Sequence, residues 1–256
     1  MTVRALSSTA RNMAAFRALE TAKPRAMRLF ADPFAVRFLG RCERALVGAS
    51  RVSRLRRWVE RYADGRAPGA RLSAIARTRL IDDVLLQEIA AGAGQIVILG
   101  AGFDCRALRL PELARAKVFE VDRPAMVRAK DLGLADIVAP HVQRVPVDFA
   151  RDNLAGCLLA AGYSPGLPSV FLWEGVTNYL DEESVGEVFD FVAANAPASS
   201  KIVFTYVHAS AIAGTFDAPG LPALLAALAA HGEPWTFGFV PEALRLPGET
   251  GSATAD

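Results

Sequence analysis

Cysteine and histidine are scarce in this chain, with three residues of each among 256. Cys42, Cys105 and Cys157 are odd in number and are not spaced as metal ligands are, so neither a disulfide framework nor a metal site is expected. They are typical of reduced thiols that serve mainly in packing, which favours a cytoplasmic protein. The few histidines leave few candidates for a catalytic base.

Long apolar runs are also lacking. Arg4 and Arg11 interrupt the first residues, so a secretory signal is not expected, and the apolar stretch 221–230 is too short to span a bilayer. The net charge of +2 indicates neither a nucleic-acid nor a membrane partner. Arginines are concentrated between residues 41 and 71, but apolar residues alternate with them there. This pattern favours the solvated face of a helix over a nucleic-acid patch.

Two kinds of pattern divide the chain. Residues 10–90 read as helices, one of them starting at Pro33 with Asp32 as its N-cap. Apolar strands then alternate with helical segments. The predicted strands are 96–99, 117–121, 142–147, 170–172 and 201–207. The alternation predicts a doubly wound, Rossmann-like α/β sheet with an N-terminal helical extension. We expect an extension over residues 1–92, a core over 93–244 and a disordered tail over 245–256.

Four consecutive predicted strands end in residues that suit a nucleoside. The first ends in a turn containing Gly100 and Gly102, and the next three end in Asp122, Asp148 and Glu174. Ligands of doubly wound sheets bind at the carboxyl ends of the strands. The order and spacing of these residues therefore predict a nucleoside site at one edge of the sheet.

Each residue has a chemical use there. Gly100 and Gly102 lack a Cβ atom, so the backbone can turn sharply and approach a ligand. Asp122 follows Gly102 by 20 residues, where a carboxylate can accept hydrogen bonds from both ribose hydroxyls. Asp148 can accept from the adenine amine, and Phe149 can pack on the base.

The same turn favours S-adenosylmethionine over a nicotinamide dinucleotide. Cys105 stands where a dinucleotide fingerprint has its third glycine, and Asp104 would repel a pyrophosphate at the start of the next helix. S-adenosylmethionine carries no phosphate. Glu174 can hold its ammonium group, and Arg77 or Arg79 can bind its carboxylate in a bidentate manner.

At these residues the sequence resembles the leucine carboxyl methyltransferase family, including its bacterial polyketide-type relatives. The resembling segments are ADPFA (31–35), AIARTRLIDD (74–83), VILGAGFDCR (97–106), FEVDRP (119–124), PVDF (146–149), LWEGVTNYL (172–180) and GEPWTFGF (232–239). The resemblance implies an S-adenosylmethionine-dependent enzyme that methylates an oxygen, typically of a carboxylate. It implies that Arg77 grips the methionyl carboxylate, and that Gly100, Asp122, Asp148, Phe149 and Glu174 contact the cofactor. A further basic contact is expected in the N-terminal helix, where Arg17 is the candidate.

The C-terminal part departs from the family pattern. Family members continue after a segment like 239–244 into a helix and two closing antiparallel strands, whereas the sequence here becomes small, polar and poor in strand formers. We therefore expect the closing hairpin to be missing and the fifth strand to have an open edge. Three explanations remain: residues 235–239 cover the edge, a second subunit covers it, or the protein is truncated.

The sequence thus predicts an O-methyltransferase acting on the carboxylate of a small molecule. A carboxylate is ionised at neutral pH and needs no general base. Tyr179 and His208 are candidates for the acceptor pocket. The alternatives are a phenolic O-methyltransferase with His208 as base, a protein C-terminal carboxyl methyltransferase, and a truncated protein that binds the cofactor without turnover.

Overall fold

The computed structural model describes residues 7–241 except 67, 219 and 231. Its centre is a parallel sheet in the order β3-β2-β1-β4-β5. The strands are β1 (Gln95–Leu99), β2 (Lys117–Asp122), β3 (Val142–Pro146), β4 (Ser169–Trp173) and β5 (Lys201–Phe204). The order reverses between β1 and β4, so the ends of these two strands flank the point where doubly wound sheets bind ligands.

Helices cover both faces because successive strand side chains point in opposite directions. On one face, Ile96 and Ile98 pack with α4 (Ala70–Ala90), α5 (Arg106–Arg109) and the 3₁₀ turn η3 (Pro111–Arg115). On the other face, Val97 and Leu99 pack with α7 (Leu154–Ala160) and α8 (Glu182–Asn195). The central strands β1, β2 and β4 are therefore buried on both sides, as their continuous apolar runs predict, whereas the edge strands β3 and β5 are partly exposed.

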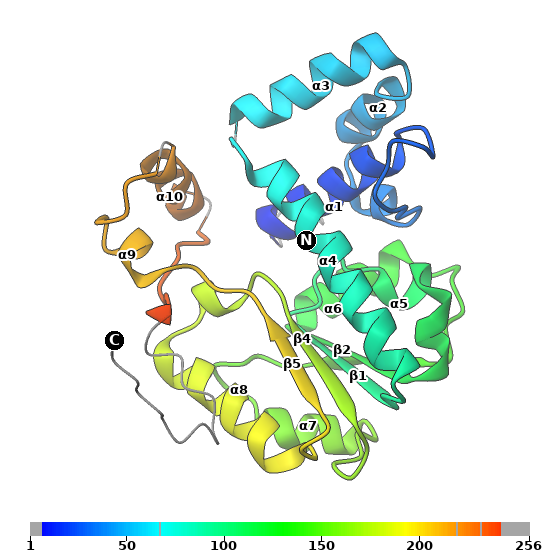
Figure 1. Cartoon of the computed structure of the whole chain (residues 1–256), viewed down its shortest axis with the longest axis vertical. Helices are drawn as coiled ribbons and strands as arrows, with labels where there is room; N and C mark the ends of the chain where they lie inside the picture. The colour runs from blue at the N-terminus through cyan, green and yellow to red at the C-terminus, as the bar shows by residue number, and fades with distance from the viewer. Residues whose placement is uncertain (1–6, 67, 219, 231, 242–256) are drawn as a thin grey trace, which may run out of the picture.

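A layer of helices precedes the sheet. It contains α1 (Ser8–Thr21), the 3₁₀ turn η2 (Ala35–Phe38), α2 (Arg41–Ala49) and α3 (Ser53–Arg66), and it packs against α6 (Pro124–Gly133). Figure 1 shows α2 and α3 away from the sheet, with α4 running from this layer along the sheet. The C-terminal half of α4 contributes Ile81, Leu85 and Ile89 to the core of the sheet.

Two local predictions differ from the structure. The helix expected at Pro33 is only the short turn η2, although Asp32 does cap it through hydrogen bonds from the Phe34 and Ala35 amides at 3.1 and 3.0 Å. In the arginine-rich region, Arg56 and Arg71 are buried rather than solvated. Arg71 is buried because Asp64 pairs with it at 2.7 Å.

The sheet has five parallel strands, as predicted, and the described residues contain no antiparallel strand. The residues that would follow 241 in a closing hairpin lie outside the described part of the chain. After β5 the chain forms α9 (Ala209–Ile212) and α10 (Leu221–Ala230) and then returns. Phe239 pairs with the continuation of β5, donating to the Val207 carbonyl at 2.9 Å and accepting from the Ala209 amide at 2.9 Å. The tail 245–256 lies outside the described residues. Among the residues described, no helix is both long and apolar enough to cross a membrane.

Candidate functional site

The glycine turn and Asp122 meet at the carboxyl ends of β1 and β2. Gly100 and Gly102 have φ values of +66° and +46°, a region that favours glycine. The Gly102 amide donates to Asp122 Oδ2 at 2.6 Å, and the Arg123 amide donates to Oδ1 at 2.7 Å. Burial raises the pKa of Asp122 from its ordinary value, although these two hydrogen bonds oppose the shift. Each carboxylate oxygen still has a lone pair available for a ligand hydroxyl.

Glu174 follows β4 and pairs with two arginines. Its Oε1 accepts from Arg77 Nε at 2.6 Å, and its Oε2 accepts from Arg106 Nη1 at 2.9 Å. Burial alone would raise the pKa of Glu174, but the two guanidinium groups outweigh it and hold that pKa below its usual value. Glu174 is therefore an anion at neutral pH. It orients Arg77 through Nε, which leaves the terminal nitrogens of Arg77 as donors for another anion.

Arg106 is the hub of a buried charge network that the sequence analysis missed. Its side chain is 3% exposed and pairs with Asp82 at 2.9 Å, with Glu174 and with Asp104. Asp82 also pairs with Arg109 at 2.6 Å. The sequence does carry an indication of this network, because the segments 74–83 and 97–106 contain charged residues among apolar neighbours.

The same network compensates the negative charge of Asp104. Asp104 accepts hydrogen bonds from the Arg106 amide, at 2.6 Å, and from the Arg106 guanidinium. Arg106 thus neutralises its charge, and Asp104 by itself is a weaker reason to exclude a pyrophosphate than the sequence suggests.

Asp148 and Phe149 follow β3 at the same edge of the sheet. The Asp148 side chain accepts from the Ala150 amide at 3.2 Å, and the Asp148 amide donates to Asp152 at 2.8 Å. These bonds form a local turn, and 37% of the Asp148 side chain remains exposed. Phe149 is half-buried and packs against the core below it. Asp148 is therefore accessible, but no hydrogen bond connects it with Asp122 or Glu174 among the described residues.

Helix α1 lies over the glycine turn. A Cβ atom placed on Gly102 would lie 3.5 Å from the Ala10 Cβ. Met13 Sδ is 3.9 Å from Arg77 Nη2, and Arg17 Nη2 donates to the Phe103 carbonyl at 2.5 Å. Arg17 Nε also pairs with Asp32 at 2.8 Å. The Arg17 guanidinium therefore reaches the glycine turn, but it is already hydrogen-bonded to two protein groups.

The two acceptor-pocket candidates lie in different surroundings. Tyr179, in the 3₁₀ turn η4 (Thr177–Tyr179), has its hydroxyl 3.4 Å from Thr9 Oγ1 of α1. His208 is exposed and lies beyond β5, where its ring stacks on Phe216 with centroids 6.1 Å apart. The structure brings Tyr179 to the covering helix and joins His208 to the aromatic cluster beyond β5.

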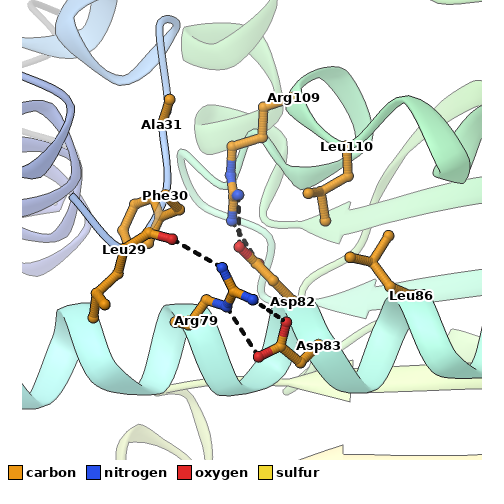
Figure 2. A pocket seen from close by; sticks show the side chains of 9 residues that line it. All are labelled: Leu29, Phe30, Ala31, Arg79, Asp82, Asp83, Leu86, Arg109 and Leu110. Carbon is orange, nitrogen blue, oxygen red and sulfur yellow. Dashed lines mark hydrogen bonds and ion pairs between the residues drawn. The ribbon is translucent and has the colours of Figure 1, made fainter. Parts of the chain in front are cut away.

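A separate pocket opens between α4, the segment 29–31 and α5, with a volume of about 260 Å³. Figure 2 shows Arg79 held between Asp83 and the Leu29 carbonyl, and Arg109 held by Asp82. The charged groups that line it are thus already paired. Arg79, the alternative to Arg77 in the sequence analysis, thus lines this separate pocket, whereas Arg77, Gly100, Asp122 and Glu174 do not.

Comparisons with known proteins agree with the motifs. The sequence profile of the leucine carboxyl methyltransferase family matches residues 10–193. A Frankia alni protein, provisionally named an S-adenosyl-L-methionine-dependent methyltransferase, is 37% identical over 77% of this chain and 68% of its own length. A Mycobacterium avium protein with the same provisional name is 40% identical over 53% of this chain and 46% of its own length. The chain thus spans about two thirds of the first relative and about half of the second.

Two crystal structures share the fold. A DUF574 family protein from Streptomyces avermitilis has a TM-score of 0.60 at 15% identity, over 94% of this chain and 83% of its own. A provisionally named methyltransferase from Thermobifida fusca has a TM-score of 0.55 at 18% identity, over 85% and 77%. The predicted doubly wound methyltransferase fold is confirmed, and the names of the relatives agree with S-adenosylmethionine as the cofactor. By its profile match and its 37% identity to the Frankia protein, the chain belongs to the leucine carboxyl methyltransferase family.

Proposed function

We propose that this protein is an S-adenosylmethionine-dependent O-methyltransferase whose acceptor is the carboxylate of a small molecule. The observation that carries the proposal is the meeting of the glycine turn, Asp122 and Glu174 at one edge of the sheet, beneath α1. The family membership supports methyl transfer, and the description of the family favours a carboxyl acceptor.

The residues at this edge fit the cofactor. Asp122 retains acceptor capacity for the ribose hydroxyls, and exposed Asp148 can accept from the adenine amine. Arg77 presents terminal nitrogens for the methionyl carboxylate, while Glu174 supplies a negative charge for the ammonium group. The charges of the site and of the cofactor are therefore complementary.

When bound, the cofactor supplies a methyl group activated by its sulfonium, and the transfer is an in-line displacement whose main requirement is orientation. The ion pair of Glu174 with Arg77 fixes the direction of that guanidinium before any ligand arrives. Asp122 fixes the glycine turn by bonding to the Gly102 amide. Helix α1 lies over the turn. A cover that excludes water during the transfer would strengthen the electrostatic interactions beneath it.

The acceptor side of the site favours a carboxylate over a phenol. A phenol needs a base to remove its proton, and His208 is the histidine that the sequence suggests for this task. In the structure His208 is exposed and packs on Phe216 beyond β5. Tyr179, beside α1, can line the acceptor pocket and donate a hydrogen bond to a carboxylate.

Calorimetric titration with S-adenosylmethionine tests the cofactor site. We expect micromolar affinity, and a loss of about ten- to a hundredfold in Arg77→Ala, because a charge-assisted hydrogen bond contributes about 1.5–3 kcal/mol. Asp122→Asn should weaken binding to a similar extent while keeping the size of the side chain. Arg79→Ala is the matched control, since Arg79 lies on the same helix but pairs with Asp83 at the surface. Wild-type affinity in both site variants would refute the assignment.

A methyl-labelled cofactor incubated with cell extract, followed by mass spectrometry, identifies the acceptor. A methyl ester releases methanol in mild base, whereas a phenol ether does not, so base treatment separates the two O-methyltransferase classes. Label on proteins would favour a protein C-terminal carboxyl methyltransferase. Cofactor binding with no labelled product would favour a protein that binds without turnover.

A further inference from the structure

Glu233 connects the C-terminal part of the described chain to the first turn of α1. Its Oε2 accepts hydrogen bonds from Ser8 Oγ at 2.7 Å, Thr9 Oγ1 at 2.7 Å and the Thr9 amide at 3.1 Å. These partners are more than 220 positions away in the sequence. The carboxylate thus satisfies donors at the positive end of the helix dipole, where a negative charge is favourable.

The segment around Glu233 is itself fixed to the edge of the sheet. The Thr236 amide donates to the Asn178 carbonyl at 2.8 Å, and Thr236 Oγ1 donates to the Leu180 carbonyl at 2.9 Å. Asn178 lies in η4 and Leu180 directly follows it, and η4 itself follows β4 and Glu174. Glu233 therefore ties α1 to the part of the structure that carries the predicted methionyl end of the site.

Ala10, Met13 and Arg17 form the face of α1 that is directed at the glycine turn. Their spacing of three and four residues places them on one side of the helix. Arg17 anchors the far end of this face to the Phe103 carbonyl, and Glu233 anchors the near end through Thr9. Since a Cβ atom on Gly102 would already contact Ala10 at 3.5 Å, a larger ligand group placed on that side of Gly102 would meet the first turns of α1.

We propose that Glu233 is a positioning residue, a latch that holds the first turn of α1 closed over the glycine turn. This latch must open for the cofactor to exchange. This proposal rests on the proposed function. Burial would raise the pKa of Glu233, but the hydrogen bonds from Ser8 and Thr9 outweigh it and lower that pKa. The latch is therefore ionised, and its bonds to α1 are charge-assisted, at neutral pH.

Hydrogen exchange of the protein without cofactor tests the closed state directly. In Glu233→Ala, we expect the amides of residues 9–13 to exchange about tenfold faster, because the loss of a charge-assisted hydrogen bond is enough for that factor. Glu233→Gln keeps an acceptor oxygen without the charge and should lie between Glu233→Ala and the wild type. Glu187→Ala, at an exposed glutamate of α8, is the control and should exchange as the wild type does.

Stopped-flow measurement of S-adenosylmethionine dissociation tests the consequence for exchange. The dissociation rate constant should rise about tenfold in Glu233→Ala and less in Glu233→Gln. In steady-state assays KM for the cofactor should rise, while kcat should fall by less than about twofold. Rates within twofold of the wild type in both variants, with unchanged exchange of α1, would overturn the latch. A fall in melting temperature with no change in dissociation rate would likewise mean that Glu233 is merely structural.

The latch and the proposed function fail separately. If the wild type binds S-adenosylmethionine and Arg77→Ala weakens it, but Glu233→Ala leaves the dissociation rate unchanged, the latch is wrong and the function stands. If the wild type does not bind the cofactor, the proposed function and its exchange step are both wrong. Faster amide exchange in Glu233→Ala would then support only the contact of Glu233 with α1.

Discussion

Replacing Arg106 by methionine should be the most destabilising single change in the charge network. Arg106 is 3% exposed and pairs with Asp82, Asp104 and Glu174. Methionine fills a similar volume but has no charge. Removing one partner of a buried ion pair costs about 3–5 kcal/mol, because the other charge remains buried without compensation.

The structure indicates which charge would be left uncompensated. Asp82 keeps Arg109, and Glu174 keeps Arg77. Asp104 loses its guanidinium partner and keeps the amide of residue 106. Most of the loss should therefore arise at Asp104, and adding Asp104→Asn to Arg106→Met should recover about half of it, as a double-mutant cycle would show.

Thermal and urea unfolding measure the effect. For a chain of this size, 3–5 kcal/mol lowers the melting temperature by roughly 10 °C. Arg106→Lys keeps the charge but loses the forked geometry, so it should lie between Arg106→Met and the wild type.

The pH dependence supplies a second check. Burial would raise the pKa of Asp104, but Arg106 and Arg17 hold it below its usual value. Such a depressed pKa stabilises the protein above the unfolded value, near 3.9, and this stabilisation is lost as the pH falls through the folded pKa. Without Arg106 the burial remains and the pKa rises, so the deficit of Arg106→Met should be smaller at pH 5 than at pH 7.5. A loss below about 1 kcal/mol, or no recovery with Asp104→Asn, would refute the reasoning.

Two further predictions concern the glycine turn and the thiols. Gly100→Ala should lower stability by about 2–4 kcal/mol and weaken cofactor binding, because φ is +66° and the new Cβ would lie 2.3 Å from Val176 Cγ2. In thermal unfolding, Val176→Ala in the same chain should relieve the clash but not the backbone strain, and full recovery would contradict this assignment. Burial raises the pKa of the Cys105 thiol, whereas Cys42 is exposed. An aromatic disulfide reagent at pH 8 should therefore modify Cys42 rapidly and Cys105 only after unfolding, and peptide mass mapping checks this order.

Much of the fold was predictable because strands buried on both faces appear as continuous apolar runs. The strand 117–121 is observed as Lys117–Asp122, and 170–172 as Ser169–Trp173. Between β1 and β2 the chain forms α5 and η3 rather than one continuous helix, because Pro111 lacks the amide that a helix interior requires. The helix expected at Pro33 is only the turn η2, because a capping residue indicates where a helix can start but not its length.

The site divides in the same way. The positions of Gly100, Asp122 and Glu174 at neighbouring strand ends were predictable from the sequence, because a strand end is a local feature and parallel pairing gathers such ends at one edge. Whether these three residues, Arg17, Arg77, Asp148 and the other predicted residues contact the cofactor stays a prediction. Arg106 and Glu233 were not found, since nothing in their immediate neighbours indicates which distant groups they meet.

The sequence by itself determined the alternation of strands and helices, the positions of the strand ends and the family. Only the tertiary structure decided that Glu174 pairs with Arg77 and Arg106, 97 and 68 positions away, and that Glu233 caps a helix 224 positions away. The physical reason is that apolar periodicity records whether a residue is buried, whereas charge pairing depends on which segments the folded chain brings within about 3 Å of each other.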